Sequence, residues 1–167
     1  MNVWELIKSD LKRICEPTWG NAVKCYFFPH GKVFAYQVWL RIVHDIKKSR
    51  IKKYLLGPLA FLFLKHYEYK YGIHCDTNIE IGEGLCIVHG GSVYLNCRGI
   101  GRNFTVFHNV TLGEYPGGGI PIVEDDVTIY PGAVVCGEIT LRNRCTVGAL
   151  TYVDKDVEEG AKVIGKA

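Results

Sequence analysis

Apolar residues recur every six positions along the second half of this chain. The aliphatic positions are Val123, Ile129, Val135, Leu141, Val147 and Val153, and the small or apolar residues four places after the first five are Val127, Ala133, Ile139, Cys145 and Thr151. An α-helix repeats every ~3.6 residues and a strand every two, so neither keeps this register. A six-residue period is typical of a β-solenoid in which each hexapeptide forms one side of a triangular coil.

The same count extends back to Cys75. It passes through Cys75, Ile81, Ile87 and Val93 and, after one inserted residue, through Ile100, Val106 and Leu112, with Phe104 and Val110 as companions. It breaks again after Leu112, where the segment EYPGGGIP (residues 114–121) is rich in glycine and proline and predicts an exposed loop. We therefore predict a mainly β protein, with a left-handed parallel β-helix over residues 73–167.

The first part of the chain, residues 1–72, follows a helical period instead. Apolar residues recur at helical spacing in two segments, one at Trp4, Ile7, Leu11 and Ile14 and one at Phe34, Val38, Ile42 and Ile46. A third helix is expected from Pro58 to Tyr71, because proline suits a helix start and Gly72 can end it. The residues between these helices, from Ser49 to Lys53, predict a basic break.

The longest apolar run is YLLGPLAFLFL, from Tyr54 to Leu64. A bilayer-spanning helix needs ~20 residues, so this run is too short to cross a membrane. We interpret it as a buried helix. The alternative is peripheral contact with the inner face of a membrane, because basic residues flank the run at Lys47, Lys48, Arg50, Lys52 and Lys53.

Composition narrows the choice of partners and location. The 167 residues carry a net charge of +3 with a pI of about 8.4, which is too weakly basic to indicate nucleic-acid binding. The seven cysteines show no metal-binding spacing, and Cys75, Cys97 and Cys145 fall in inward slots where a thiol packs as a small hydrophobe. Without a signal-peptide pattern, we expect a reducing, cytoplasmic location and no disulfide framework.

Two histidines stand out by their register. His89 and His108 both occupy the third place of their hexapeptides, and three hexapeptides make one coil, so they should lie on one edge, one coil apart. Adjacent strands are ~4.8 Å apart. The same edge continues with Pro131 and Ala149, which predicts a smooth wall. A histidine pair beside such a wall suits a general base next to a cofactor channel.

Two alternatives for these histidines remain open. An exposed histidine ladder could have no chemical role. A zinc ion could also be held by three histidines across a subunit boundary, but a third ligand is not visible because His74 belongs to a different edge. We expect no metal.

Four strings carry a resemblance to a known family. GEGLCIVHGGSVYLN, FTVFHNVTLG, TIYPGAVVCGEI and TVGALTYVDKDV, in this order, resemble the serine acetyltransferase branch of the hexapeptide acyltransferases. The resemblance covers residues 73–167. It implies transfer of an acetyl group from acetyl-CoA to a hydroxyl by a homotrimer with active sites between neighbouring solenoids. Whether the trimers pair further stays open.

The resemblance also implies roles for individual residues. His89 matches the catalytic histidine, which acts as general base, and His108 becomes a second candidate that positions the acceptor or cofactor. Lys162 matches a lysine near the nucleotide phosphates. The positions that line the pantetheine arm are matched by Gly113, Pro131, Gly132, Ala133, Gly148 and Ala149.

The chain departs from serine acetyltransferases where those enzymes hold the charged amino acid. The aspartate before the catalytic histidine is Val88 here, the loop's arginine and histidine are Gly119 and Ile120, and the carboxylate that pairs with the catalytic histidine is His74. At these positions the chain resembles the short acetyltransferases of polysaccharide assembly, whose acceptor is a sugar hydroxyl.

We therefore expect a saccharide acceptor, which Tyr115 and Tyr130 could stack against. Serine O-acetylation in cysteine biosynthesis is the alternative acceptor chemistry. An alternative of another class is a catalytically silent trimeric solenoid that acts as an assembly partner.

Overall fold

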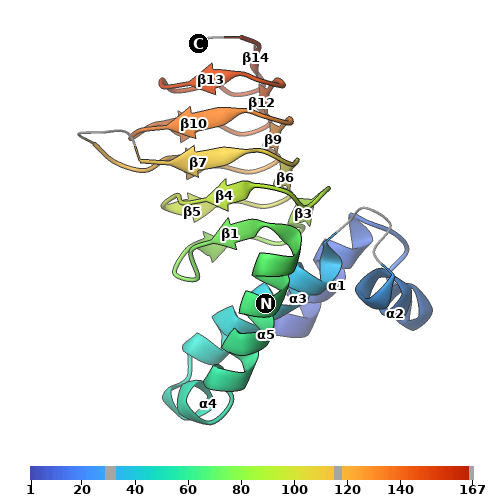
Figure 1. Ribbon diagram of the computed structural model, residues 1–167. Coiled ribbons are helices and arrows are strands. Elements are labelled where there is room, and N and C mark those ends of the chain that lie inside the picture. The colour runs from blue at the N-terminus through green and yellow to red at the C-terminus, as the bar shows by residue number, and fades with distance from the viewer. Residues whose placement is uncertain (29–32, 115–117, 166–167) are drawn as a thin grey trace.

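The computed structural model describes residues 1–28, 33–114 and 118–165, and in it a three-sided column of short parallel strands stands on a group of helices (Figure 1). Each side of the column is one sheet whose strands come from successive coils. The first sheet contains β1 (Ile73–Cys75), β4 (Val93–Leu95), β7 (Thr111–Gly113), β10 (Val134–Cys136) and β13 (Tyr152–Val153). The second contains β2 (Glu80–Ile81), β5 (Gly99–Ile100), β8 (Ile122–Val123) and β11 (Thr140–Leu141). The third contains β3 (Cys86–Ile87), β6 (Thr105–Val106), β9 (Thr128–Ile129), β12 (Thr146–Val147) and β14 (Lys162–Val163).

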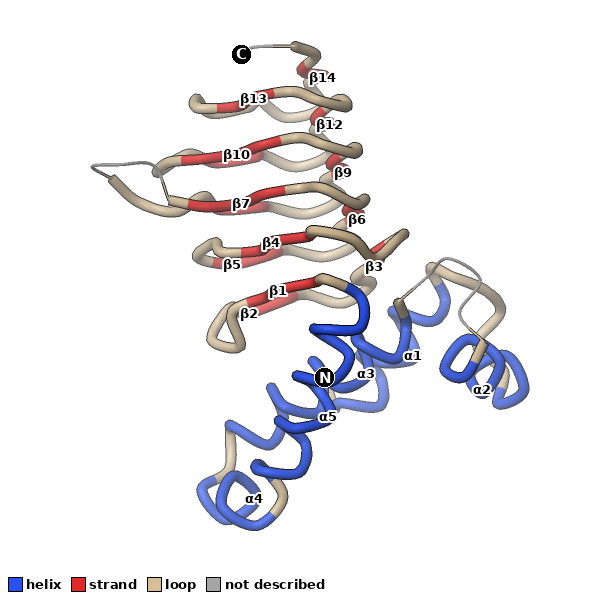
Figure 2. Tube along the Cα trace, viewed as in Figure 1, coloured by secondary structure: helices blue, strands red, loops and turns tan. Residues whose placement is uncertain are grey.

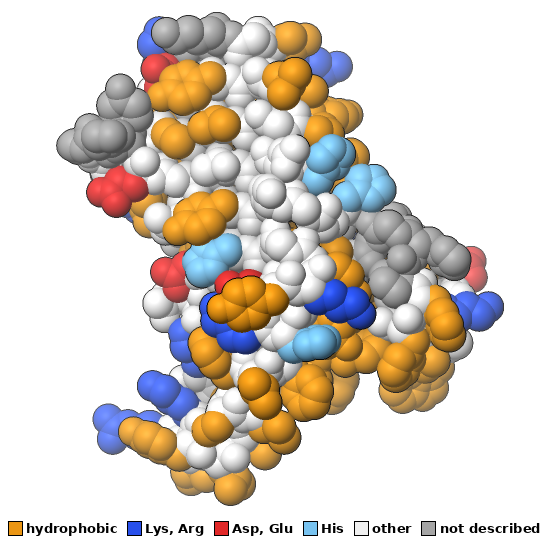
Figure 3. All heavy atoms as spheres, in the orientation of Figure 1, with side chains coloured by type: hydrophobic (Ala, Val, Ile, Leu, Met, Phe, Trp, Pro, Cys, Tyr) orange, Lys and Arg blue, Asp and Glu red, His pale blue; other side chains and the backbone are white. Residues whose placement is uncertain are grey.

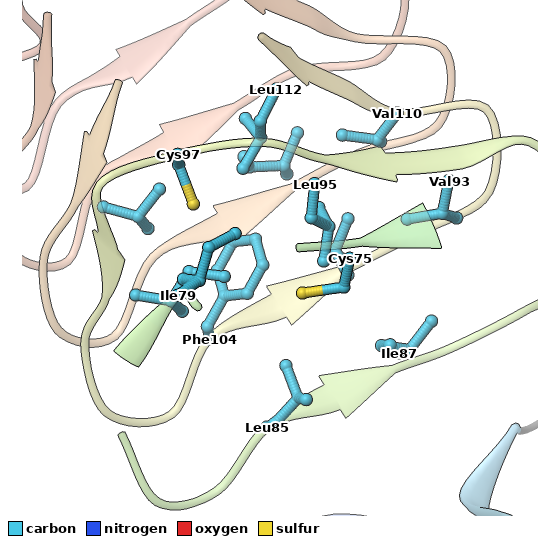
Figure 4. Packing of buried hydrophobic residues seen from close by; sticks show 14 of the residues in the cluster. Cys75, Ile79, Leu85, Ile87, Val93, Leu95, Cys97, Phe104, Val110 and Leu112 are labelled. Carbon is cyan, nitrogen blue, oxygen red and sulfur yellow. The ribbon is translucent and has the colours of Figure 1, made fainter. Parts of the chain in front are cut away.

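The predicted left-handed parallel β-helix with a helical N-terminal region is confirmed. The six-residue period works because it places the same inward slot above itself in every coil, as the pairings of Ile87 with Val106, Val106 with Ile129 and Ile129 with Val147 show. The predicted inward residues form one continuous apolar column, and Figure 4 shows part of it, with Cys75 and Cys97 packed among Ile79, Leu95 and Phe104.

The helical region lies at the β1 end of the column (Figure 2). Its helices are α1 (Val3–Lys12), α2 (Trp19–Phe27), α3 (Phe34–Lys47), α4 (Arg50–Leu55) and α5 (Gly57–Tyr71). α5 has proline in its first turn and ends at Gly72, whose φ of 60° suits the left-handed cap. In the described part of the chain, no helix has both the length and the apolar character needed to cross a membrane.

Two expectations for this region are wrong. The segment Ser49–Lys53, expected to be a break, contains the start of α4, with the Ser49 hydroxyl accepting a hydrogen bond from the Lys52 amide. The run Tyr54–Leu64, interpreted as one buried helix, spans the end of α4, a turn and the start of α5. Of its residues only Ala60 and Leu64 are buried, because only one stripe of α5 packs against α3 and the solenoid.

A buried ion pair joins α1 and α3 to the first coil. The Arg41 guanidinium donates to both carboxylate oxygens of Asp10 at 2.9 Å, and to the carbonyl oxygens of Ile81 and Gly82 at 2.7 and 2.6 Å. The Leu85 amide donates to Asp10 at 2.8 Å. Both charged side chains are about 1% exposed. Mutual pairing satisfies charges that would otherwise be costly to bury, so this network fixes the helices on the base of the solenoid.

Candidate active site

His89 and His108 lie side by side on one edge of the solenoid. Their ring centroids are 5.8 Å apart, with the ring planes tilted by 59°. His89 is exposed and His108 is half-buried. They meet because β3 and β6 pair in register. The third place of the hexapeptide that begins at Ile87 therefore lies next to the third place of the hexapeptide that begins at Val106, one coil further on. The juxtaposition expected from the sequence is therefore present in the fold.

The backbone around His89 is held from both sides. The Val88 amide donates to the Val106 carbonyl at 2.9 Å, which continues the ladder up to the histidine. On the other side, the Gly91 amide donates to the Tyr71 carbonyl at the end of α5, at 2.7 Å. A Cβ atom at Gly90 would lie 2.7 Å from that same Tyr71 oxygen. Glycine after His89 thus lets the last turn of α5 press against the edge and fix the histidine.

Above the two histidines the edge becomes small and smooth. The register places Pro131 and then Ala149 over His108 in the next two coils. Gly132 and Gly148 stand beside them, and a Cβ at Gly148 would come within 3.1 Å of the Val163 carbonyl. These small residues form a narrow strip, which the exposed Leu150 side chain borders next to Gly132.

Lys162 lies on the last strand of the same sheet, where it pairs with Thr146, three places before Ala149. It is exposed on β14, which is separated from the strand of His89 by β6, β9 and β12. Four strand spacings amount to about 19 Å. The histidines and the lysine therefore lie at opposite ends of the same face.

Two of the residues expected to line a cofactor channel present no side chain on the histidine edge of the same chain. Gly113 ends β7, at the opposite end of that strand from His108, so one chain does not bring it to the histidine edge. The Ala133 side chain is fully buried in the solenoid interior, so at that position only the backbone can face the outer surface. A site that used both Gly113 and His89 would need two chains.

An aromatic pair lies beside the histidines, and only one of its members, Tyr130, is predicted from the sequence. Phe107 and Tyr130 stack at 5.2 Å with ring planes 11° apart, and the Phe107 ring lies 6.5 Å from that of His89. Both occupy the second, outward place of their hexapeptides, which is the pattern that could have revealed Phe107. Tyr115, the other expected stacking residue, lies outside the described residues.

His74 has a different environment from the histidine pair. Its Nδ1 atom lies 2.8 Å from Oε1 of Glu68 on α5, and its ring stacks on Tyr94 at 4.9 Å. Lys65 donates to both oxygens of the same carboxylate at 2.9 and 3.0 Å. The position expected to hold a carboxylate thus carries an imidazole that has its own carboxylate partner. Among the described residues, no three or more His, Cys, Asp or Glu side chains are grouped to hold a metal ion.

The inward cysteines are poorly suited to nucleophilic chemistry. Burial raises the pKa of Cys97 to about 12 and that of Cys145 to about 11, and it raises the pKa of Cys75 further. Only the thiolate is a good nucleophile. These three thiols therefore pack as core residues. On the exposed edge, the candidate catalytic side chains are the two histidines.

Comparison with known proteins finds acetyltransferases among the relatives of this chain. No protein-family model matches the chain. A serine acetyltransferase of Bacillus licheniformis is 39% identical over 134 residues, which cover 77% of this chain and 59% of that protein. A putative colanic acid biosynthesis acetyltransferase of Escherichia coli K12 is 30% identical over 123 residues, covering 72% of this chain and 76% of that protein.

A solved structure extends the likeness to the helical region. The crystal structure of Neisseria gonorrhoeae serine acetyltransferase in complex with serine matches with a TM-score of 0.75 at 25% identity, covering 98% of this chain and 66% of that one. The chain spans about three fifths of the length of the serine acetyltransferases that it matches in sequence. By its repeats, its fold and its similarity to a relative that it covers for three quarters of its length, the chain belongs to the serine acetyltransferase-like family of hexapeptide-repeat acyltransferases.

Proposed function

We propose that this protein is an acetyl-CoA-dependent O-acetyltransferase in which His89 is the general base. The observation that carries the proposal is the pair of the exposed His89 and the half-buried His108, with ring centroids 5.8 Å apart, at the foot of a strip of small residues. Imidazole exchanges protons near neutral pH, which suits a group that must take a proton and return it. Family membership supplies the reaction class.

In the proposed reaction His89 accepts the proton of the acceptor hydroxyl while the hydroxyl oxygen attacks the thioester carbonyl. The carbon–sulfur bond then breaks, the coenzyme A sulfur takes the proton back from the imidazolium, and the products are an acetyl ester and free coenzyme A. The half-buried His108 beside it is placed to hold the acceptor or the thioester. No covalent intermediate on the protein is required, in line with the raised pKa values of the buried thiols.

The comparisons favour L-serine as the acceptor. Most of the matched relatives are serine acetyltransferases, and the matched Neisseria gonorrhoeae enzyme was solved with serine bound. They support this acceptor better than the saccharide that the sequence pattern favours. We therefore take L-serine as the first acceptor to test.

A sugar hydroxyl is the second candidate, because the positions at which serine acetyltransferases hold the charged amino acid carry no charge here. Val88, Gly119 and Ile120 stand where serine acetyltransferases have charged residues, and serine is a zwitterion that needs charged partners. The stacked Phe107 and Tyr130 offer an aromatic surface instead. The relative that the chain covers most completely among those named above is a putative colanic acid biosynthesis acetyltransferase.

Release of free thiol from acetyl-CoA tests both candidates in one assay. Purified protein is incubated with L-serine and, in parallel, with sugars and nucleotide-sugars. His89→Ala is the blank, and His66→Ala, an exposed histidine on α5 away from the edge, is the matched control. Release with serine that is lost only in His89→Ala supports a serine acetyltransferase, and release with a sugar alone supports the second candidate.

Binding of coenzyme A separates an unknown acceptor from an inactive protein. If no acceptor gives thiol release but coenzyme A binds and Lys162→Glu weakens the binding, the acceptor lies outside the panel. If coenzyme A does not bind at all, the proposal is wrong, and the silent solenoid that acts only as an assembly partner takes its place.

A further inference from the structure

The end of the molecule farthest from β14 is formed by α4 and the start of α5 (Figure 1). It carries an exposed apolar surface that the proposed chemistry does not use. We call residues 50–62, from α4 through the first turns of α5, the α4–α5 tip. Ile51, Leu55 and Leu62 are 79%, 76% and 65% exposed, and Tyr54, Leu56, Leu59 and Phe61 are exposed as well. Soluble proteins rarely expose so many contiguous large apolar side chains without a partner.

The fold leaves these side chains uncovered because α5 is apolar on more than one face. Ala60, Leu64 and Glu68 form the stripe that packs inward, and Phe63, outside the tip as defined, stacks on Trp39 at 4.5 Å. Leu59 and Leu62 lie on the other side of the helix and remain exposed. A helix that is apolar nearly all round is ordinarily buried, so its exposed face calls for a partner.

The charge around the tip indicates which partner. From Ile46 to Tyr67 the chain contains no Asp or Glu, and its charged residues are Lys47, Lys48, Arg50, Lys52, Lys53 and Lys65. Two of them pair with carboxylates just outside this segment, Lys52 with Asp45 at 3.1 Å and Lys65 with Glu68 at 2.9 Å. Figure 3 shows orange apolar and blue basic side chains gathered together over the α4 end of the molecule. An apolar surface with a basic rim is complementary to a membrane whose headgroups are anionic.

We propose that the α4–α5 tip inserts its apolar side chains into an anionic lipid surface, with the basic residues on the headgroups. The strands and the histidine edge lie along the column rather than at this tip, so the active-site edge stays clear of the bilayer (Figure 1). This arrangement carries forward the membrane contact that the flanking lysines suggest in the sequence. It does not depend on which acceptor the enzyme uses.

Vesicle flotation with the full-length protein tests the proposal. The probes are vesicles of pure phosphatidylcholine and vesicles of phosphatidylcholine mixed equally with phosphatidylglycerol. We expect binding to the anionic vesicles, weaker binding to the neutral ones, and loss of the difference at high salt, because salt screens the charges. Equal binding to both kinds of vesicle, or to neither, would overturn the proposal.

Two pairs of variants locate the contact. Ile51→Gln with Leu55→Gln removes exposed apolar groups and should weaken anionic-vesicle binding at least about tenfold, whereas Trp19→Gln, equally exposed on α2, should not. Arg50→Glu with Lys53→Glu should weaken it at least about tenfold, whereas Lys12→Glu with Lys155→Glu changes the net charge equally and should have little effect.

Folding and activity controls keep the result interpretable. All the changed residues are exposed, and circular dichroism with thiol release toward a soluble acceptor should match the wild type. Light scattering decides the other use of such a surface. If the wild type forms a large assembly that the Ile51→Gln, Leu55→Gln variant splits, and no vesicle is bound, the tip joins copies of this chain and the membrane proposal fails.

Discussion

His89 and His108 differ in exposure, and this difference predicts different kinetic effects. A general base contributes about 10²–10⁴-fold to a rate, so His89→Ala should lower kcat by that factor with little change in KM. His108→Asn keeps a polar side chain in a half-buried position and should mainly raise KM. Steady-state kinetics with acetyl-CoA and the identified acceptor measures both. A larger loss of kcat in the His108 variant than in the His89 variant would exchange the two roles.

His44 predicts how the stability of the fold depends on pH. Burial, together with the positive charges of Arg41, Lys47 and Lys48, lowers its pKa to about 4, with Asp76 acting in the opposite direction. In the unfolded chain the pKa of His44 is about 6.5, so the unfolded state binds a proton before the folded state does. The contribution of neutral His44 to stability is therefore fully present above pH 6.5 and is lost as the pH falls toward 4. The full loss is about 3 kcal/mol.

Urea unfolding at several pH values between 7 and 4.5 checks this effect of His44. The wild type should lose stability faster than His44→Gln as the pH falls, because glutamine does not titrate. The comparison is made as a difference between the two proteins, since carboxylates titrate in both. Parallel curves for the two proteins over this range would contradict the assignment.

The residue patterns show how much of the site could be predicted from the sequence. The edge of His89 and His108 follows from counting in sixes, because in a solenoid equal positions of successive coils stack. Phe107 was missed because one aromatic in an outward place has no pattern until its neighbour Tyr130 is placed over it. The position of Gly113 could not be interpreted from one chain, because a site between copies is not encoded in the register of a single column.

Among the elements, the buried Asp10–Arg41 pair predicts how firmly the helices hold to the solenoid. Asp10→Ala would leave a buried guanidinium without its carboxylate, and should lower the free energy of unfolding by about 3–5 kcal/mol. Glu158→Ala breaks the exposed Arg142–Glu158 pair and should cost no more than about 1 kcal/mol. Urea titration of the two variants measures the contrast. Similar small losses in both would mean that the buried pair does not anchor α1.

The elements also show why the helical region was predicted less well than the β-helix. α1, α3 and α5 place apolar residues against a core, so their spacing is visible, whereas α2 and α4 bury no residue and have no such pattern. In the structure the side chains of Thr18 and Ser49 cap the starts of these two helices. The exposure of α5 beyond its inner stripe could not be foreseen, because a run that is apolar on every face carries no information about which face is covered.

At the scale of the whole molecule, the separation of Gly113 from the histidine edge bears on assembly. If the site lies between neighbouring solenoids of a homotrimer, His89 comes from one chain and Gly113 from the next. His89→Ala and Gly113→Val should then each be inactive as pure trimers, the latter because a larger side chain fills the channel. Among the described residues, a Cβ at Gly113 meets only Thr111 Cγ2 at 3.8 Å, so these residues can accept the change.

Mixed trimers test this division of the site directly. When equal amounts of the two inactive variants are unfolded and refolded together, a site is intact only if an unchanged His89 faces an unchanged Gly113 across an interface. With random assembly around a three-fold axis this holds for about a quarter of the sites, so about a quarter of the wild-type activity should return. If His89 and Gly113 served one site within the same chain, every site would carry one of the two changes. No activity would then return, however the chains were mixed.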